Sequence, residues 1–134
     1  MNNNVNIFKK IILFYMFLCF GFFCFGFFEG LSSGSDDIVN DIDEPFSLLD
    51  IIVLVYFPIL FYILFLLYKL KPLGKKIFLP FLILFEIFGY INWDLNDFIY
   101  DNKLIYYLDY FDYFLVGVII TFLYFTDVKK EFDL

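Results

Sequence analysis

The chain has 134 residues, 63% of them hydrophobic and 26% aromatic, and a formal net charge of −7. A soluble domain is typically about 45–50% apolar, and a fold this small leaves much of its surface in water. The polar residues are too few to cover such a surface, and the mean hydropathy of +0.83 agrees. The composition therefore excludes an ordinary soluble domain and predicts an integral membrane protein.

Four apolar runs follow one another along the chain. Residues 11–28 carry no charge, and residues 48–70 are apolar except near their two ends. Residues 77–93 contain a single acid, Glu86, and residues 106–126 end in a stretch without charge, residues 113–126. A helix rises about 1.5 Å per residue and the hydrocarbon layer is about 30 Å thick, so a span takes roughly 20 residues. The most apolar parts of the first two runs, residues 11–28 and 51–68, come close to this length, whereas those of the last two, residues 77–91 and 113–126, need their flanks. The four runs predict an all-α protein with four transmembrane helices.

The first run also has features of a signal peptide. Lys9 and Lys10 precede it, and Ser33 and Ser35 are small residues near which cleavage could occur. The apolar region of a signal peptide usually has about 7–15 residues, which residues 11–28 exceed. We therefore expect a retained helix, with cleavage as the alternative.

The lysines predict which way the helices face. Eight of the nine fall on one side of the membrane if the chain crosses four times, and Lys103 falls on the other side with most of the acids. Lysine-rich segments stay in the cytoplasm, so we expect an antiparallel bundle with both termini cytoplasmic. The expected segments between and beyond the spans are a cytoplasmic N-terminus 1–10, an acidic outer loop 29–47, a basic cytoplasmic hairpin 71–76, an acidic outer loop 94–105 and a cytoplasmic C-terminus 127–134.

Glu86 is the candidate for chemistry, because it lies near the expected bilayer centre. A charged carboxylate there costs about 3 kcal/mol or more, so we expect a neutral acid hydrogen-bonded to a neighbouring helix. Depth counted from the inner lysines at about 1.5 Å per residue brings it level with Thr121, and Tyr56 and Tyr62 are further candidate partners. An interhelical hydrogen bond is the favoured interpretation, and a proton or cation relay is the alternative.

The same count of depth predicts a packing contact between the third and fourth spans. Gly89 lies three residues after Glu86 on one helical face, and Gly117 with Thr121 forms a pair of small residues four apart. Small residues allow membrane helices to approach closely. We therefore expect these two helices to meet at Gly89 and Gly117.

Other polar groups have simpler explanations. Cys19 lies in an apolar run and is expected to be inert filling. Tyr113 belongs to a tyrosine cluster typical of an aromatic belt at the outer boundary, where solvation accounts for Asp109 and Asp112. The acidic stretch 36–44 lacks the ligand spacing of a calcium loop. With no zinc spacing, phosphate loop or nucleophile–base pair in the sequence, we expect no metal, no cofactor and no enzymatic activity.

Two stretches carry a resemblance, YKLKPLGKKIFL at residues 68–79 and LYFTDVKKEF at residues 123–132. They resemble small uncharacterised four-span bacterial inner-membrane proteins, with a basic-Gly-basic hairpin before the third span and a lysine-Phe ending after the fourth. The resemblance covers about the C-terminal half. It implies an architecture and a location in the bacterial cytoplasmic membrane, without an established activity.

The expected function is a non-enzymatic interaction or accessory role in that membrane, of which toxin immunity is a specific version. The alternative is a small proton or cation conductor that uses Glu86. Expected partners are the lipid bilayer and a membrane-protein partner or second copy of the chain. The acidic outer face argues against binding to nucleic acid.

Overall fold

The computed structural model describes residues 3–33, 48–91 and 103–132. These residues are helical apart from turns at residues 69–71 and 126–127 and the last residue, and no strand occurs among them. The all-α fold class is therefore confirmed for this part of the chain. The helices are α1 (Asn3–Ser33), α2 (Leu48–Tyr68), α3 (Pro72–Ile91), α5 (Lys103–Phe125) and the single turn α6 (Val128–Glu131).

The helices extend beyond the apolar runs of the sequence. α1 begins at Asn3 rather than at residue 11, because its buried face continues through Val5 and Phe8 and no proline or glycine interrupts its first turns. α3 begins at Pro72 rather than at residue 77, and α5 at Lys103 rather than at residue 106. Most of the acidic segments 29–47 and 94–105 lies outside the described residues.

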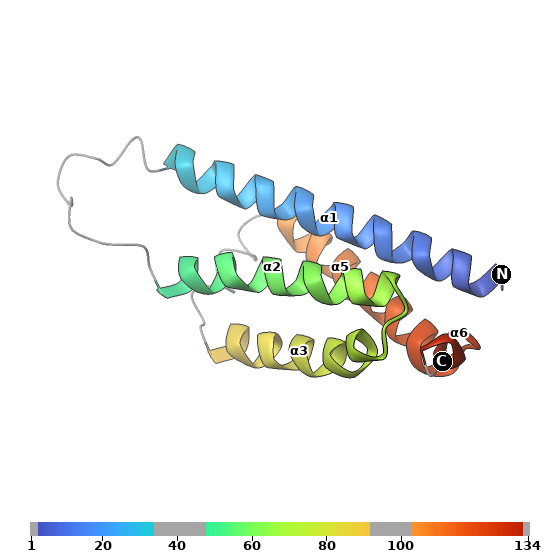
Figure 1. The fold of residues 1–134 in the computed structure, drawn as a ribbon. Coiled ribbons are helices and arrows are strands. Elements are labelled where there is room, and N and C mark those ends of the chain that lie inside the picture. Colours follow the sequence, from blue (N-terminus) through green and yellow to red (C-terminus); the bar gives the residue numbers. More distant parts are fainter. Residues whose placement is uncertain (1–2, 34–47, 92–102, 133–134) are drawn as a thin grey trace.

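In Figure 1, α2 lies between α1 and α3, and α5 passes behind α2. α1 packs against α2, α5 and α6, and α2 packs against α3. Figure 1 places the N-terminus, the turn between α2 and α3 and the C-terminus at one end. We call this the lysine end, because the described part of the chain brings to it Lys9, Lys10, Lys69, Lys71, Lys75, Lys76, Lys129 and Lys130.

The turn between α2 and α3 closes α2 with a left-handed cap. The Leu70 N–H donates to the Leu67 carbonyl (2.9 Å), and the Lys71 N–H donates to the Leu66 carbonyl (2.8 Å). This pair of bonds satisfies carbonyls that the helix end leaves open. Leu70 takes the left-handed position with a φ of 56°, and Pro72 then begins α3, where its missing N–H is tolerated.

Gly74 lies within α3 rather than in a connection between helices. The sequence predicts a hairpin over residues 71–76, but Gly74 of this stretch is helical and buried against α2. A Cβ at this position would lie 2.9 Å from Leu66 Cβ and 2.9 Å from Leu67 N. Glycine therefore permits the close approach of α3 to the end of α2.

The core is best packed toward the lysine end. The Phe8 ring, fully buried, lies 6.0 Å from the Phe122 ring of α5 and 6.0 Å from the Phe132 ring after α6. The buried face of α1 repeats every three or four residues, which directs one helical stripe at its neighbours. The buried hydrophobic residues of the described chain are Val5, Phe8, Ile12, Tyr15, Cys19, Leu60, Ile63, Leu64, Leu67, Phe78, Leu115, Ile119, Leu123, Val128 and Phe132.

The outer faces of the bundle are apolar as well. Large hydrophobic side chains are exposed on every long helix, and many are aromatic. One helical segment of the described chain, Asn3–Cys24, is long and apolar enough by itself to cross a membrane, and Leu54–Tyr68 and Tyr110–Phe125 are shorter apolar segments. Examples of the exposed side chains are Leu13, Phe14, Phe17 and Phe20 of α1, Val55, Ile59 and Phe65 of α2, Ile83, Leu84 and Ile87 of α3, and Tyr110, Phe114 and Phe125 of α5.

Candidate functional site

Glu86 joins α3 to α5 through a hydrogen bond. The Tyr113 hydroxyl donates to Glu86 Oε2 at 3.0 Å. Both side chains are exposed at the surface of the bundle, so their polar atoms meet where two helices lie side by side rather than in the packed core. The general expectation of a hydroxyl partner on the neighbouring helix therefore has a specific donor, Tyr113.

Thr121 is not the donor that the sequence suggested. Its Oγ1 donates instead to the Gly117 carbonyl of its own helix, at 2.9 Å. A second bond between the helices explains the difference, because the Tyr124 hydroxyl donates to the Lys75 carbonyl at 3.1 Å. Lys75 and Glu86 are separated by eleven residues on α3, and Tyr113 and Tyr124 by eleven on α5. This register places Tyr113, two turns from Thr121, level with Glu86.

The predicted contact at Gly117 does not form within the described chain. Gly117 is exposed, and a Cβ built there would meet nothing within 4 Å. Under the register set by the two hydrogen bonds, Gly117 is level with Leu82 rather than with Gly89. The side-chain surroundings of Gly89 lie outside the described residues.

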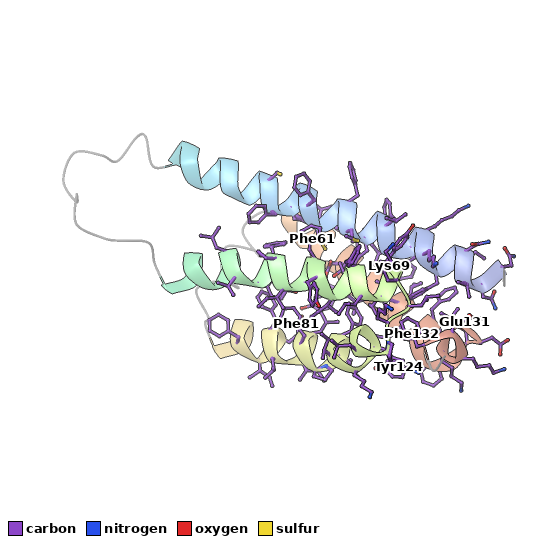
Figure 2. All side chains as sticks on the ribbon, in the orientation of Figure 1. Phe61, Lys69, Phe81, Tyr124, Glu131 and Phe132 are labelled. Atoms are coloured by element: carbon purple, nitrogen blue, oxygen red, sulfur yellow. The ribbon has the colours of Figure 1, made fainter. Side chains whose placement is uncertain are left out.

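Of the three predicted partners of Glu86, which are Thr121, Tyr56 and Tyr62, the fold brings Tyr56 close to it. Its ring stacks on the Phe85 ring with centroids 3.6 Å apart and on the Phe81 ring at 5.1 Å; Phe81 is labelled in Figure 2 between α2 and α3. Its phenol interacts electrostatically with Glu86 and with Asp112. Tyr62, by contrast, is 57% exposed on the outer face of α2.

Asp112 provides a second acid that the sequence interpretation left at the membrane boundary. The Tyr15 hydroxyl of α1 is hydrogen-bonded to the Asp112 carboxylate. The Cys19 thiol, one turn further along α1, is hydrogen-bonded to Tyr15. Cys19 is buried, as an apolar filler would be, but it lies beside this acid rather than in purely apolar surroundings.

These side chains form one group, the polar cluster, to which all four long helices contribute. Asp112 and Tyr113 are adjacent on α5, so one faces α1 while the other reaches α3. Glu86 lies eleven residues from Lys75, or about 16 Å along the helix axis. That is about half of a 30 Å hydrocarbon layer. The members of the polar cluster are Tyr15, Cys19, Tyr56, Glu86, Asp112 and Tyr113.

The chemistry available to the polar cluster is proton exchange and hydrogen bonding. Carboxyl, phenol and thiol groups can each give up and take back a proton. Among the described residues, no group of three or more histidine, cysteine, aspartate or glutamate side chains is placed to hold a metal ion. The sequence carried no signal for this role of Asp112, because it lies seventeen residues before Lys129, about 25 Å along a helix, which is close to the expected outer boundary.

No protein-family model, curated protein or solved structure matches this chain. The resemblance to small four-span proteins thus stays a prediction.

Proposed function

We propose that this chain is an integral protein of the bacterial cytoplasmic membrane that crosses it four times, through α1, α2, α3 and α5. The observation that carries the proposal is the apolar outer face of every long helix. A soluble monomer rarely exposes an apolar patch larger than about 300–600 Å². Here such side chains surround the bundle, which suits contact with lipid.

The orientation follows from the lysine end. The two termini and the α2–α3 turn lie together, and lysine-rich ends stay on the cytoplasmic side of the membrane. This arrangement supports two cytoplasmic termini. It also brings the polar cluster to about the middle of the hydrocarbon layer, where hydrogen bonds between helices have no competition from water.

Within the membrane, we propose a non-enzymatic interaction or accessory role, with toxin immunity as its specific version. The polar cluster supports this role because its hydrogen bonds link helices: Tyr113 of α5 to Glu86 of α3, and Tyr15 of α1 to Asp112 of α5. Such bonds fix helix register and help a thin bundle hold one shape. A toxin gene beside this gene would favour immunity, and its absence in related genomes would count against it.

A proton conductor is the second candidate, and Asp112 is the observation that favours it. A relay through the membrane needs at least two groups that exchange protons, and the fold brings Asp112 and Glu86 into one cluster with three tyrosines. Intramembrane acids of this kind commonly mark proton pathways. The two candidates differ in one measurable property, the movement of protons across a sealed bilayer.

The deciding experiment uses the full chain reconstituted in vesicles that contain a pH-sensitive dye. The accessory role predicts the proton leak of protein-free vesicles, for the wild-type chain and for Glu86→Gln alike. A leak that the wild-type chain raises and that Glu86→Gln and Asp112→Asn abolish establishes the conductor instead. Tyr62→Phe is the matched control, because Tyr62 lies outside the polar cluster.

A further inference from the structure

Two lysines at the lysine end converge on one tyrosine ring. The Lys9 ammonium of α1 lies 5.6 Å from the centre of the Tyr68 ring, and the Lys69 ammonium lies 5.9 Å from the same point. Lys69 also lies 5.6 Å from the Phe65 ring. Cations are attracted to aromatic faces, but two cations near one ring repel each other. An anion held between them would remove that repulsion.

No carboxylate fills this role in the described part of the chain. The ion pair at the lysine end joins Lys130 to Asp127 at 2.7 Å, whereas the contacts recorded for Lys9 and Lys69 are with aromatic rings. Lys69 is exposed and Lys9 half-buried. Both side chains are therefore at least partly open to the surroundings of the bundle.

An aromatic seam continues from these lysines along the line where α1 and α2 pack. The Phe20 and Phe61 rings lie 6.4 Å apart, and the Phe23 and Phe57 rings lie 5.2 Å apart. Phe20 is 53% exposed; Figure 2 labels Phe61 beside α1 and Lys69 near the end of α2. A phospholipid has a negatively charged phosphate at one end and apolar acyl chains beyond it. The two lysines could bind the phosphate, and the partly exposed aromatic seam could contact an acyl chain.

We propose that Lys9, Tyr68 and Lys69 bind the phosphate of an anionic phospholipid whose acyl chain lies along the α1–α2 aromatic seam. The proposal rests on the proposed membrane location and adds a defined lipid site to it. The ammonium groups donate hydrogen bonds to the phosphate oxygens. The tyrosine lies at the level of the headgroups, as aromatic residues at membrane interfaces do. The anionic lipids of the cytoplasmic leaflet provide the ligand.

The test measures binding of phosphatidylglycerol to the purified full chain by native mass spectrometry, with phosphatidylcholine, a zwitterionic lipid of zero net charge, as the comparison. The double variant Lys9→Gln/Lys69→Gln is expected to lower phosphatidylglycerol affinity between about fivefold and thirtyfold. The matched control is Lys76→Gln/Lys129→Gln, which removes the same charge from exposed positions at the same end. The control is expected to change affinity by less than about twofold, because the site is local.

Several results would overturn the inference. An equal loss of affinity in both double variants means diffuse attraction to the whole lysine end. Equal binding of the two lipids means that the site does not select an anionic lipid. If inorganic phosphate alone protects Lys9 and Lys69 from acylation as well as the lipid does, the site binds an anion and not a lipid. If the double variant does not fold, acylation of wild-type lysines replaces it: phosphatidylglycerol must shield Lys9 and Lys69 while Lys76 still reacts.

The membrane location is tested separately. A wild-type chain that alkaline carbonate extracts from membranes contradicts the proposed function itself. A chain that stays in the membrane and binds both lipids alike contradicts the lipid site alone.

Discussion

Replacing Tyr113 with phenylalanine removes one hydroxyl group and keeps the aromatic ring. In the structure that hydroxyl donates to Glu86 Oε2 at 3.0 Å, and a second bond, from the Tyr124 hydroxyl to the Lys75 carbonyl, also joins α5 to α3. The substitution therefore leaves Glu86 without this donor while it barely changes the packed volume. We expect it to weaken the association of α3 with α5.

The size of the effect follows from the position of the bond. Hydrogen bonds between membrane helices contribute about 0.6 kcal/mol on average and about 1.7 kcal/mol at most. For Tyr113→Phe we expect a loss of about 1 kcal/mol, because the acceptor is an acid in an apolar layer. This corresponds to about a fivefold change in the unfolding equilibrium constant, since about 1.4 kcal/mol is tenfold.

The assay is reversible unfolding in mixed micelles with rising dodecyl sulfate, followed by circular dichroism. Tyr62→Phe is the control, since Tyr62 is exposed on α2 and lies outside the polar cluster. A double-mutant cycle with Glu86→Leu isolates the pair and is expected to give a coupling free energy of about 1 kcal/mol. The reasoning is refuted by a coupling of zero, or by equal unfolding of the Tyr113→Phe and Tyr62→Phe variants.

Two further predictions concern glycine positions and one exposed ion pair. Gly74→Ala is expected to destabilise the bundle by about 1–3 kcal/mol, since the new Cβ would lie 2.9 Å from Leu66 Cβ. Gly117→Ala is expected to be neutral or up to about 1 kcal/mol stabilising, because its Cβ meets nothing within 4 Å. Equal changes in the free energy of unfolding of the two variants, measured in the same assay, would contradict the packing described for Gly74. The hydrogen bond and charge of Lys130 lower the pKa of the Asp127 carboxyl, so the pair contributes above the ordinary aspartate pKa and is lost as pH falls through the lowered value. A carbon-13 NMR titration should give a higher Asp127 pKa in Lys130→Gln than in the wild-type chain, and identical values would contradict the pairing.

The helical class could be predicted from the sequence because it depends on local properties. Long apolar runs form helices in either environment, and lysines gather where those runs end. Pro58 lies inside α2 without ending it, which agrees with the continuous helix expected across residues 48–70. Glu86 could also be singled out, because one acid in an apolar run is visible in the sequence alone.

The partner of Glu86 could not be predicted, because the register of α5 against α3 cannot be counted from Lys129 without knowing the turn that follows α5. Depth was counted from Lys129, as if residues 125–129 continued the α5 axis. In the structure α5 ends at Phe125, and Lys129 lies in α6 after the break at Thr126 and Asp127. The count was therefore too long on α5, and it selected Thr121 in place of Tyr113.

Asp112 was missed for a related reason. Its partner Tyr15 belongs to α1, nearly a hundred residues earlier in the sequence, and their contact depends on how α1 packs against α5. The turn before α3 shows a local limit as well. Glycine is the usual residue in a left-handed cap, yet Leu70 occupies it and Gly74 serves the close contact between helices.

Four crossings with both ends in the cytoplasm remain the central claim, and protease access in intact spheroplasts tests it most directly. Protease sites are inserted into residues 34–47 and 92–102, and different epitope tags are placed on the two ends of the chain. The account predicts that external protease cuts both inserted sites and leaves both tags attached to their fragments. Loss of either tag, or resistance of either inserted site, would contradict it.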